Sequence, residues 1–236
     1  MEKNEQQCWE HFFELGKSRL KSKEYSLAVK EFSKSIIFKN TANNYEIASS
    51  YLYRGNAHYY LKNLDKANDD LKKGILLGPN RLDYILALHN RMQINSDRED
   101  YYEIIDDAKK LITLGSNNKY VRHIHDEPNY ILIIAIAYLK LGHYRNALIY
   151  LDRMSPVLFK NSEISKKATY YICTGWARSK LKEYESALED FKKVLSIDRN
   201  LLIQSFTFRI FNIKLADEID DAMKMLLMVE HNIVFK

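Results

Sequence analysis

Large apolar and small residues recur along the chain with helical spacing. An aromatic or large apolar residue is followed three positions later by Ala, and another large apolar residue comes four positions after that. Spacings of three and four keep side chains on one face of an α-helix, so each copy predicts an amphipathic helix. The four clear copies are Tyr25-Ala28-Phe32, Leu64-Ala67-Leu71, Tyr144-Ala147-Leu151 and Tyr184-Ala187-Phe191. Two weaker copies are Tyr101-Ile104-Ala108 and Ile219-Ala222-Leu226.

A second small residue lies twelve positions before the Ala of each clear copy, and a large apolar residue lies four positions earlier still. The small residues are Gly16, Gly55, Ala135 and Gly175. Two helices with matched small residues can approach closely, while large side chains fill the grooves beside them. The pattern therefore predicts an all-α protein of antiparallel helix pairs, with short polar turns inside each pair.

Two adjacent acidic residues and two lysines repeat within these second helices. Asp69 and Asp70 precede Lys72 and Lys73. The same arrangement recurs with two Asp at 106–107 and two Lys at 109–110. Spacings of three residues suit ion pairs on one helix. We expect both acidic residues of each pair to lie on a solvated face.

The paired small residues resemble the tetratricopeptide repeat, a helix-turn-helix unit of about 34 residues. The resemblance implies a right-handed superhelical solenoid that forms a single domain over 1–236, with about five to six repeats. Their approximate ranges are 8–41, 47–80, 84–117, 127–160, 167–200 and 202–236, and the third and sixth are degenerate. Armadillo and HEAT repeats have a comparable length, but they lack two small residues twelve positions apart.

The resemblance also implies a ligand groove, since the first helices of successive repeats line a concave face in this family. Our candidate groove residues are Phe13, Lys17, Lys21, Asn56, Tyr59, Tyr60, Gln93, Lys140, Trp176 and Lys180. Lysines can form charge-assisted hydrogen bonds to carboxylates, and aromatic faces supply contact area. We expect a protein or peptide partner with acidic or C-terminal carboxylate character. In the competing interpretation, the aromatic residues are packing residues and the lysines only solubilise the surface.

Some members of the family grip the C-terminal tails of heat-shock chaperones with a carboxylate clamp of cations and Asn residues. Asn56 and Asn90 match the two Asn positions of such a clamp. Leu52, Asn129 and Ile133 stand where its basic residues should be. A carboxylate site needs its cations, so the resemblance to a clamp, and with it a co-chaperone role, is weak.

The C-terminal segment is apolar on more than one side. Residues 223–229 contain three Met, two Leu and one Val. Methionine-rich surfaces adapt to different partners, so Met225, Met228 and Phe235 are candidates for self-association or another interface. Alternatively, this tail folds back over the last repeat.

The sequence lacks signs of catalysis or of a cofactor. It has no Gly-rich phosphate loop, no His-Glu-x-x-His and no Gly-x-Ser-x-Gly motif. His123 and His125 precede a helix start at Pro128, which favours a loop over a metal site. Cys8 and Cys173 are far apart, and the N-terminus lacks an apolar signal segment. No apolar run is long enough to span a bilayer, so we expect a soluble cytoplasmic protein.

These observations favour a protein-interaction scaffold or adaptor over an enzyme, with a chaperone link as one form of that role. The alternative is an RNA-binding solenoid that uses Lys and aromatic residues of the groove. The net charge of +5 is modest and gives RNA binding little support. A third possibility is a subunit of a larger assembly, held through the Met-rich end.

Overall fold

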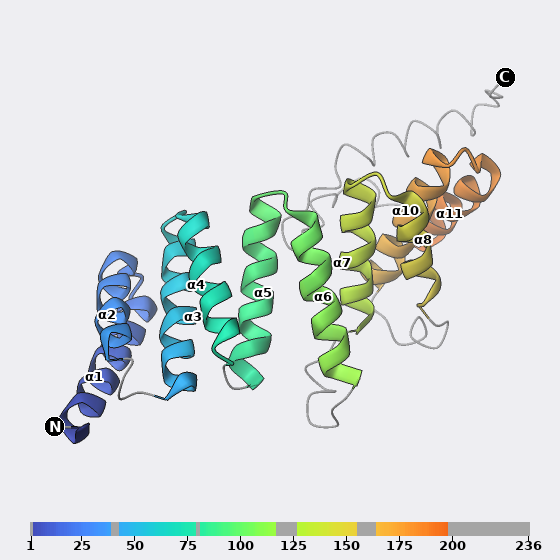
Figure 1. The fold of residues 1–236 in the computed structure, drawn as a ribbon. Helices are drawn as coiled ribbons and strands as arrows, with labels where there is room; N and C mark the ends of the chain where they lie inside the picture. The colour runs from blue at the N-terminus through green and yellow to red at the C-terminus, as the bar shows by residue number, and fades with distance from the viewer. Residues whose placement is uncertain (1, 39–42, 79–80, 117–126, 155–163, 198–236) are drawn as a thin grey trace. The chain divides into compact units, whose positions relative to one another are not determined.

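The computed structural model describes residues 2–38, 43–78, 81–116, 127–154 and 164–197, and every regular element within these ranges is an α-helix (Figure 1). The predicted all-α class is therefore confirmed. The chain divides into two compact units, Met1–Arg98 and Glu99–Lys236. The division falls inside the third expected repeat, and a single domain over 1–236 stays a prediction.

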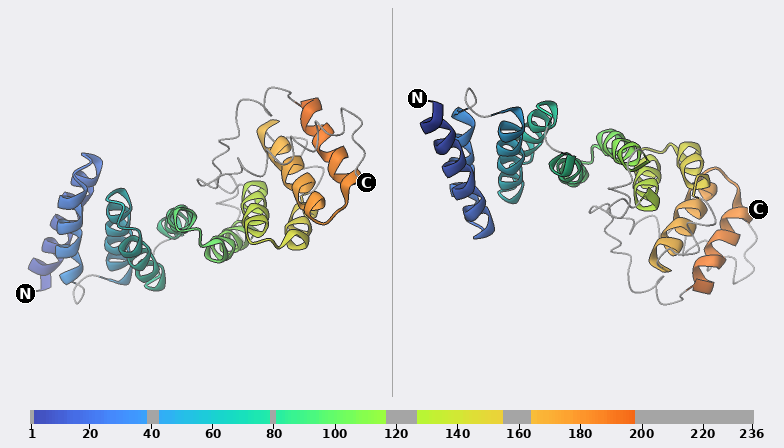
Figure 2. Two further views of the ribbon diagram at one scale, coloured as in Figure 1. Left: turned by 90° about the horizontal axis from the view of Figure 1, so that it is seen from above. Right: turned by 90° about the horizontal axis from the view of Figure 1, so that it is seen from below.

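The first unit contains two helix pairs and one further helix. Helices α1 (Glu2–Lys21) and α2 (Tyr25–Ile37) pack together, as do α3 (Asn44–Tyr60) and α4 (Leu64–Leu76), and α5 (Arg81–Asp97) follows against α4. Figure 2 shows both pairs side by side from two further directions. Trp9, Phe13 and Phe32 form the first part of the core, and Leu52 and Leu71 belong to the second.

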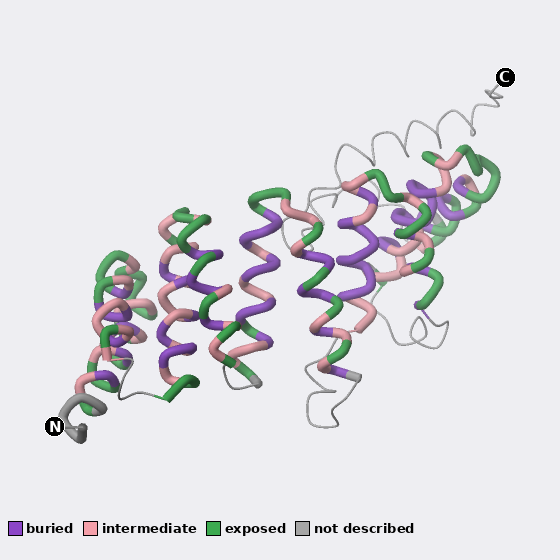
Figure 3. Tube along the Cα trace, in the orientation of Figure 1, coloured by how far each residue is buried: buried purple, intermediate pink, exposed green. Residues whose placement is uncertain are grey.

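The second unit repeats this architecture. It contains α6 (Tyr101–Ser116), α7 (Glu127–Lys140), α8 (Tyr144–Asp152), α10 (Ile164–Lys180) and α11 (Tyr184–Ile197). Helix α7 packs on α6, α8 and α10, and residues 130–137 are all buried (Figure 3). A helix that is apolar all round has to be buried on all sides, which explains the long apolar run in its sequence.

The turns that lead into α2, α4, α6, α8 and α11 use the same backbone conformation. The residue two positions before each second helix has a positive φ between 57° and 75°. These residues are Lys23, Lys62, Glu99, Gly142 and Lys182. In four of the turns the next N–H also donates to a carbonyl five residues earlier, as from Asn63 to His58 at 2.9 Å. This left-handed C-cap ends one helix and directs the chain into the next, although only one copy has the Gly that the conformation favours.

The predicted small residues lie where the two helices of a pair touch. A Cβ atom added to Gly175 would stand 2.6 Å from the ring of Phe191, and one added to Gly16 would stand 2.6 Å from Phe32. At Gly55 the nearest side-chain atom, from Leu71, would be 3.1 Å away. The large residue of the second helix therefore packs against the small residue of the first, as the spacing predicts.

The prediction that both acidic residues of each pair are solvated is wrong for the second one. Asp69 and Asp106 are exposed, but Asp70 and Asp107 are only 4% and 0% exposed. Asp70 follows the buried Ala67 by three positions, so it lies near the buried face of the helix. Its carboxylate needs a cation there, and α3 supplies one.

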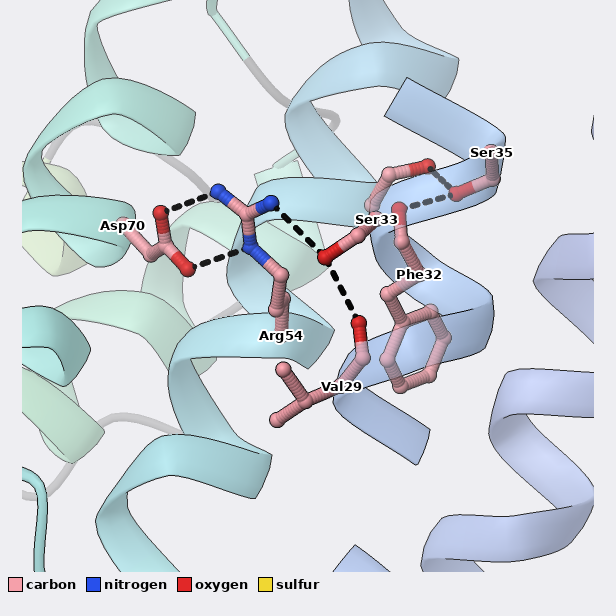
Figure 4. A network of polar contacts seen from close by, with 7 residues as sticks. Val29, Phe32, Ser33, Ser35, Arg54 and Asp70 are labelled. Atoms are coloured by element: carbon pink, nitrogen blue, oxygen red, sulfur yellow. Dashed lines mark hydrogen bonds and ion pairs between the residues drawn. The ribbon is translucent and has the colours of Figure 1, made fainter. Parts of the chain in front are cut away.

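Arg54 is that cation, and it links three helices (Figure 4). Its Nε and Nη2 atoms donate to the two carboxylate oxygens of Asp70 at 2.7 and 2.8 Å. Its Nη1 atom donates to the hydroxyl of Ser33 on α2 at 3.0 Å. A bidentate Arg–carboxylate pair has a defined geometry, so this contact fixes how the neighbouring helices pack.

Candidate functional site

A cleft opens on the first unit between α1, the start of α2 and α3. Its volume is about 880 Å³. The lining residues are Glu14, Lys17, Ser18, Leu20, Lys21, Lys23, Tyr25, Tyr53, Asn56 and Tyr60. Four of the predicted groove residues, Lys17, Lys21, Asn56 and Tyr60, thus come together in one concave site.

The cleft carries more positive than negative charge. Lys17 donates to Glu14 at 2.8 Å, and this hydrogen bond raises the pKa of the lysine. The pair is neutral and leaves two further lysines at the rim. Lys21 and Lys23 are exposed, and no carboxylate among the described residues pairs with either of them. An anionic ligand would supply the missing counter-charge.

Two tyrosines form a flat apolar wall beside these lysines. The rings of Tyr25 and Tyr60 stack with centroids 4.8 Å apart and an interplanar angle of 15°. Tyr60 is 54% exposed, so a large part of its side chain remains accessible. Tyr53 lines the cleft and meets Phe13 edge to face at 5.4 Å. Stacked, half-exposed aromatic rings offer contact area at little cost in side-chain entropy.

The two Asn residues of the clamp resemblance lie side by side. Asn90 on α5 donates from Nδ2 to Oδ1 of Asn56 on α3 at 2.7 Å. Leu52, at one of the positions that would need a cation, is 4% exposed and belongs to the core. The amides of a clamp are therefore present in this unit without a cation at position 52.

Other predicted groove residues of the first unit serve the core. Phe13 is 8% exposed and stacks on Trp9, which matches the packing interpretation of this residue. Tyr59 packs against the second part of the core, and the ammonium of Lys62 lies 5.4 Å from its ring centre. The side-chain nitrogen of Gln93 is buried, with no hydrogen-bond partner within the described residues.

The remaining candidates lie in the second unit. Trp176 is 5% exposed, and its indole N–H has no partner in the described part of the chain. Lys140 ends α7 and Lys180 ends α10, and these two helices contact one another. The structure thus divides the ten predicted groove residues between two units.

Several residues that line the cleft were not predicted from the sequence, Lys23 and Tyr25 among them. The groove register covers only first helices, whereas Lys23 lies in the turn and Tyr25 begins the second helix. A signal was present, because Tyr25 opens the first copy of the repeated motif. Tyr25 begins a helix and follows lysines in the preceding turn, and this combination could have predicted a ligand contact.

Some expectations fall outside the described residues. These are the interface candidates Met225, Met228 and Phe235 and the loop residues His123 and His125. Among the described residues, no cluster of His, Cys, Asp or Glu could hold a metal ion. No described helix has the length and apolar character needed to cross a membrane. Burial raises the pKa of the Cys173 thiol to about 12, as expected for an inert core residue.

Comparisons with known proteins identify the type of fold. The sequence model of the tetratricopeptide repeat family matches residues 170–201, which cover most of α10 and all of α11. A crystal structure of MamA protein aligns with a TM-score of 0.60 at 15% identity, over 84% of this chain and 96% of that chain. A putative kinesin light chain from Podosopora anserina with nearly identical TPR-like repeats aligns with a TM-score of 0.59 at 12% identity, over 83% and 96%.

No curated protein sequence matches the chain. At 12–16% identity, the structural similarities establish a fold and no function. The helical-pair solenoid predicted from the spacing of small and large residues is the fold of these structures. The chain therefore has the fold of tetratricopeptide-repeat proteins and carries a tetratricopeptide repeat at residues 170–201.

Proposed function

We propose that this protein is a protein-interaction scaffold whose first unit binds an acidic peptide segment of a partner. One observation carries the proposal: the cleft combines two exposed lysines that lack a carboxylate partner in the described residues with a stacked pair of tyrosines. The tetratricopeptide fold supports it, because stacked helix pairs with extended concave surfaces generally bind other proteins.

The charges and the rings would make different contributions. Lys21 and Lys23 would each form a charge-assisted hydrogen bond with a carboxylate of the peptide, worth about 1.5–3 kcal/mol when the contact is shielded from water. The exposed part of the Tyr60 ring would bury apolar surface of the peptide. The charges of Glu14 and Lys17 cancel, so this pair would favour neither an acidic nor a basic peptide. We therefore assign the selectivity for acidic peptides to Lys21 and Lys23.

Affinity capture from cells that make the protein tests this function. The Lys21→Glu/Lys23→Glu variant should lose its principal partner, since two favourable contacts become repulsive. Lys30→Glu/Lys62→Glu is the matched control. It makes the same change in net charge, its residues do not line the cleft, and Lys62 has the same positive φ in the next turn as Lys23. If both variants lose the partner equally, or if both retain it, the cleft is not the binding site.

RNA binding is the second candidate, because lysines beside stacked rings could also bind phosphates and a base. The dependence of affinity on ionic strength distinguishes RNA binding from peptide binding. RNA affinity should fall steeply between about 50 and 200 mM salt, because many phosphates are neutralised, whereas a peptide held by two lysines and by apolar contact with the rings should lose less of its affinity. A link to chaperone tails stays a prediction, and a pull-down with C-terminal tails of heat-shock chaperones would test it.

A further inference from the structure

The second helices of the described repeats share an acidic residue at their seventh position, with one exception. Counted from the first residue of each helix, this position holds Glu31, Asp70, Asp107 and Asp190 in α2, α4, α6 and α11. All four are at most 8% exposed. In α8 the seventh position holds Tyr150 instead. Helix α8 therefore lacks a negative charge that α2, α4, α6 and α11 have at this position.

The tenth position, counted in the same way, is always a cation. It is Lys in α2, α4, α6 and α11, and it is Arg153 directly after the end of α8. In three helices it pairs with the acid. Lys34 lies 2.8 Å from Glu31, Lys193 lies 3.7 Å from Asp190, and Lys110 lies 4.0 Å from Asp107. In α4 the acid is paired instead by an Arg of the preceding helix. Acid and cation thus neutralise each other in α2, α4, α6 and α11.

Arg153 has no such acid to pair with. Its guanidinium carbon lies 5.3 Å from the centre of the Tyr150 ring, and no carboxylate of the described residues contacts it. A second cation approaches the same ring, since the ammonium of Lys109 on α6 lies 5.6 Å from its centre. Tyr138 on α7 completes the cluster, with its ring 5.6 Å from that of Tyr150.

The cluster keeps its positive charge. Partial burial lowers the pKa of Lys109, but the nearby Tyr150 and Tyr138 side chains act in the opposite direction and leave the pKa raised. A phenol O–H group can also donate a hydrogen bond to a ligand. Lys109 and Arg153 are exposed, so a ligand can reach both cations from solvent.

We propose that Lys109, Arg153, Tyr138 and Tyr150 form a site for a doubly charged phosphate group. Two cations match its charge, a guanidinium suits its geometry, and two phenol hydroxyls can fill its remaining acceptor positions. The chemistry is the same for inorganic phosphate and for a phosphorylated side chain of a partner. The site lies within the second unit and does not depend on the cleft of the first.

Calorimetric titration with inorganic phosphate, at constant ionic strength and at a pH where it is a dianion, tests the site. Arg153→Gln should weaken phosphate binding at least about tenfold. Tyr150→Asp should abolish it, because this substitution restores the acid of the other helix pairs next to Arg153. Arg145→Gln is the matched control, since it removes an exposed cation from α8 outside the cluster and should leave the affinity unchanged.

Two further probes separate the sources of the phosphate. A phosphoserine tripeptide that binds more tightly than inorganic phosphate indicates a protein ligand, and equal affinities indicate the free ion. An oligouridylate without a terminal phosphate should bind poorly, and equal binding would overturn the assignment in favour of a phosphodiester. The proposal also fails if phosphate does not bind at millimolar concentration, or binds Arg153→Gln as well as the unmodified protein. Arg153 is exposed, so this variant should stay folded.

Discussion

The contact between Gly175 and Phe191 allows the packing of a helix pair to be tested quantitatively. A methyl group at position 175 would lie 2.6 Å from the Cε1 atom of a ring that is only 1% exposed. Ala favours a helix over Gly by about 1 kcal/mol, but overpacking a core costs about 1–3 kcal/mol. We expect Gly175→Ala to lower the free energy of unfolding by about 1 kcal/mol.

The helix pair of α7 and α8 suggests how to relieve this clash. It has Ala135 and Leu151 at the positions of Gly175 and Phe191, so the chain itself combines Ala with Leu. Phe191→Leu alone leaves a small cavity and should cost about 1–2 kcal/mol. In the double variant the new methyl group enters that cavity, so the double variant should be about 2 kcal/mol more stable than the sum of the two single effects predicts.

Urea unfolding measures the two single variants and the double variant, followed by circular dichroism and by tryptophan fluorescence, to which Trp176 in the same helix contributes beside Trp9. Gly55→Ala is a useful comparison, because its methyl group would be 3.1 Å from Leu71 and its cost should be smaller. If the single effects simply add, the close approach of these two residues does not determine how α10 and α11 pack.

Three further predictions concern the ion pair, the histidines and the turns. Arg54→Ala should cost about 3 kcal/mol, because Asp70 stays buried without a cation, and Arg54→Leu/Asp70→Leu should recover most of the loss in the same unfolding assay. Burial lowers the pKa of His58 and of His89, so both stabilise the fold fully above their unfolded pKa near 6.5, and stability measured by urea should fall as pH decreases below that value. His58→Gln should flatten that pH dependence, and an unchanged profile would contradict the assignment. Lys62→Gly and Lys182→Gly should each raise the free energy of unfolding by about 0.5–1 kcal/mol, since both residues have a positive φ, while Gly142→Ala should lower it by a similar amount.

The sequence predicted the helix pairs because their packing depends on residue size at fixed spacings. Gly16 and Gly175 face Phe side chains of the paired helix, and such a contact repeats wherever the spacing repeats. The burial of Asp70 could not be predicted in the same way. Its partner Arg54 lies one position before Gly55, whereas Arg178, which pairs with Asp190, lies three positions after Gly175. The Arg that pairs with this acid therefore has no fixed place in the preceding helix.

The cleft was predictable only in part, for a related reason. Lys17, Lys21, Asn56 and Tyr60 followed from the groove register of the first helices. The stack of Tyr60 on Tyr25 joins the end of one helix to the start of another across two repeats, and no spacing rule relates them. Phe13 satisfies the same register and yet packs in the core, because its ring meets Trp9 and Tyr53.

Photo-cross-linking from inside the cleft tests the central claim most directly. A benzophenone amino acid replaces Tyr60, which lines the cleft and is 54% exposed, or Leu76, which is 85% exposed and lies outside it. Irradiation in cell extract should link position 60, and not position 76, to a protein at a segment rich in Asp and Glu. Adding Lys21→Glu/Lys23→Glu should remove that product. A partner linked only from position 76, or linked from position 60 regardless of the two lysines, would contradict binding of an acidic peptide in the cleft.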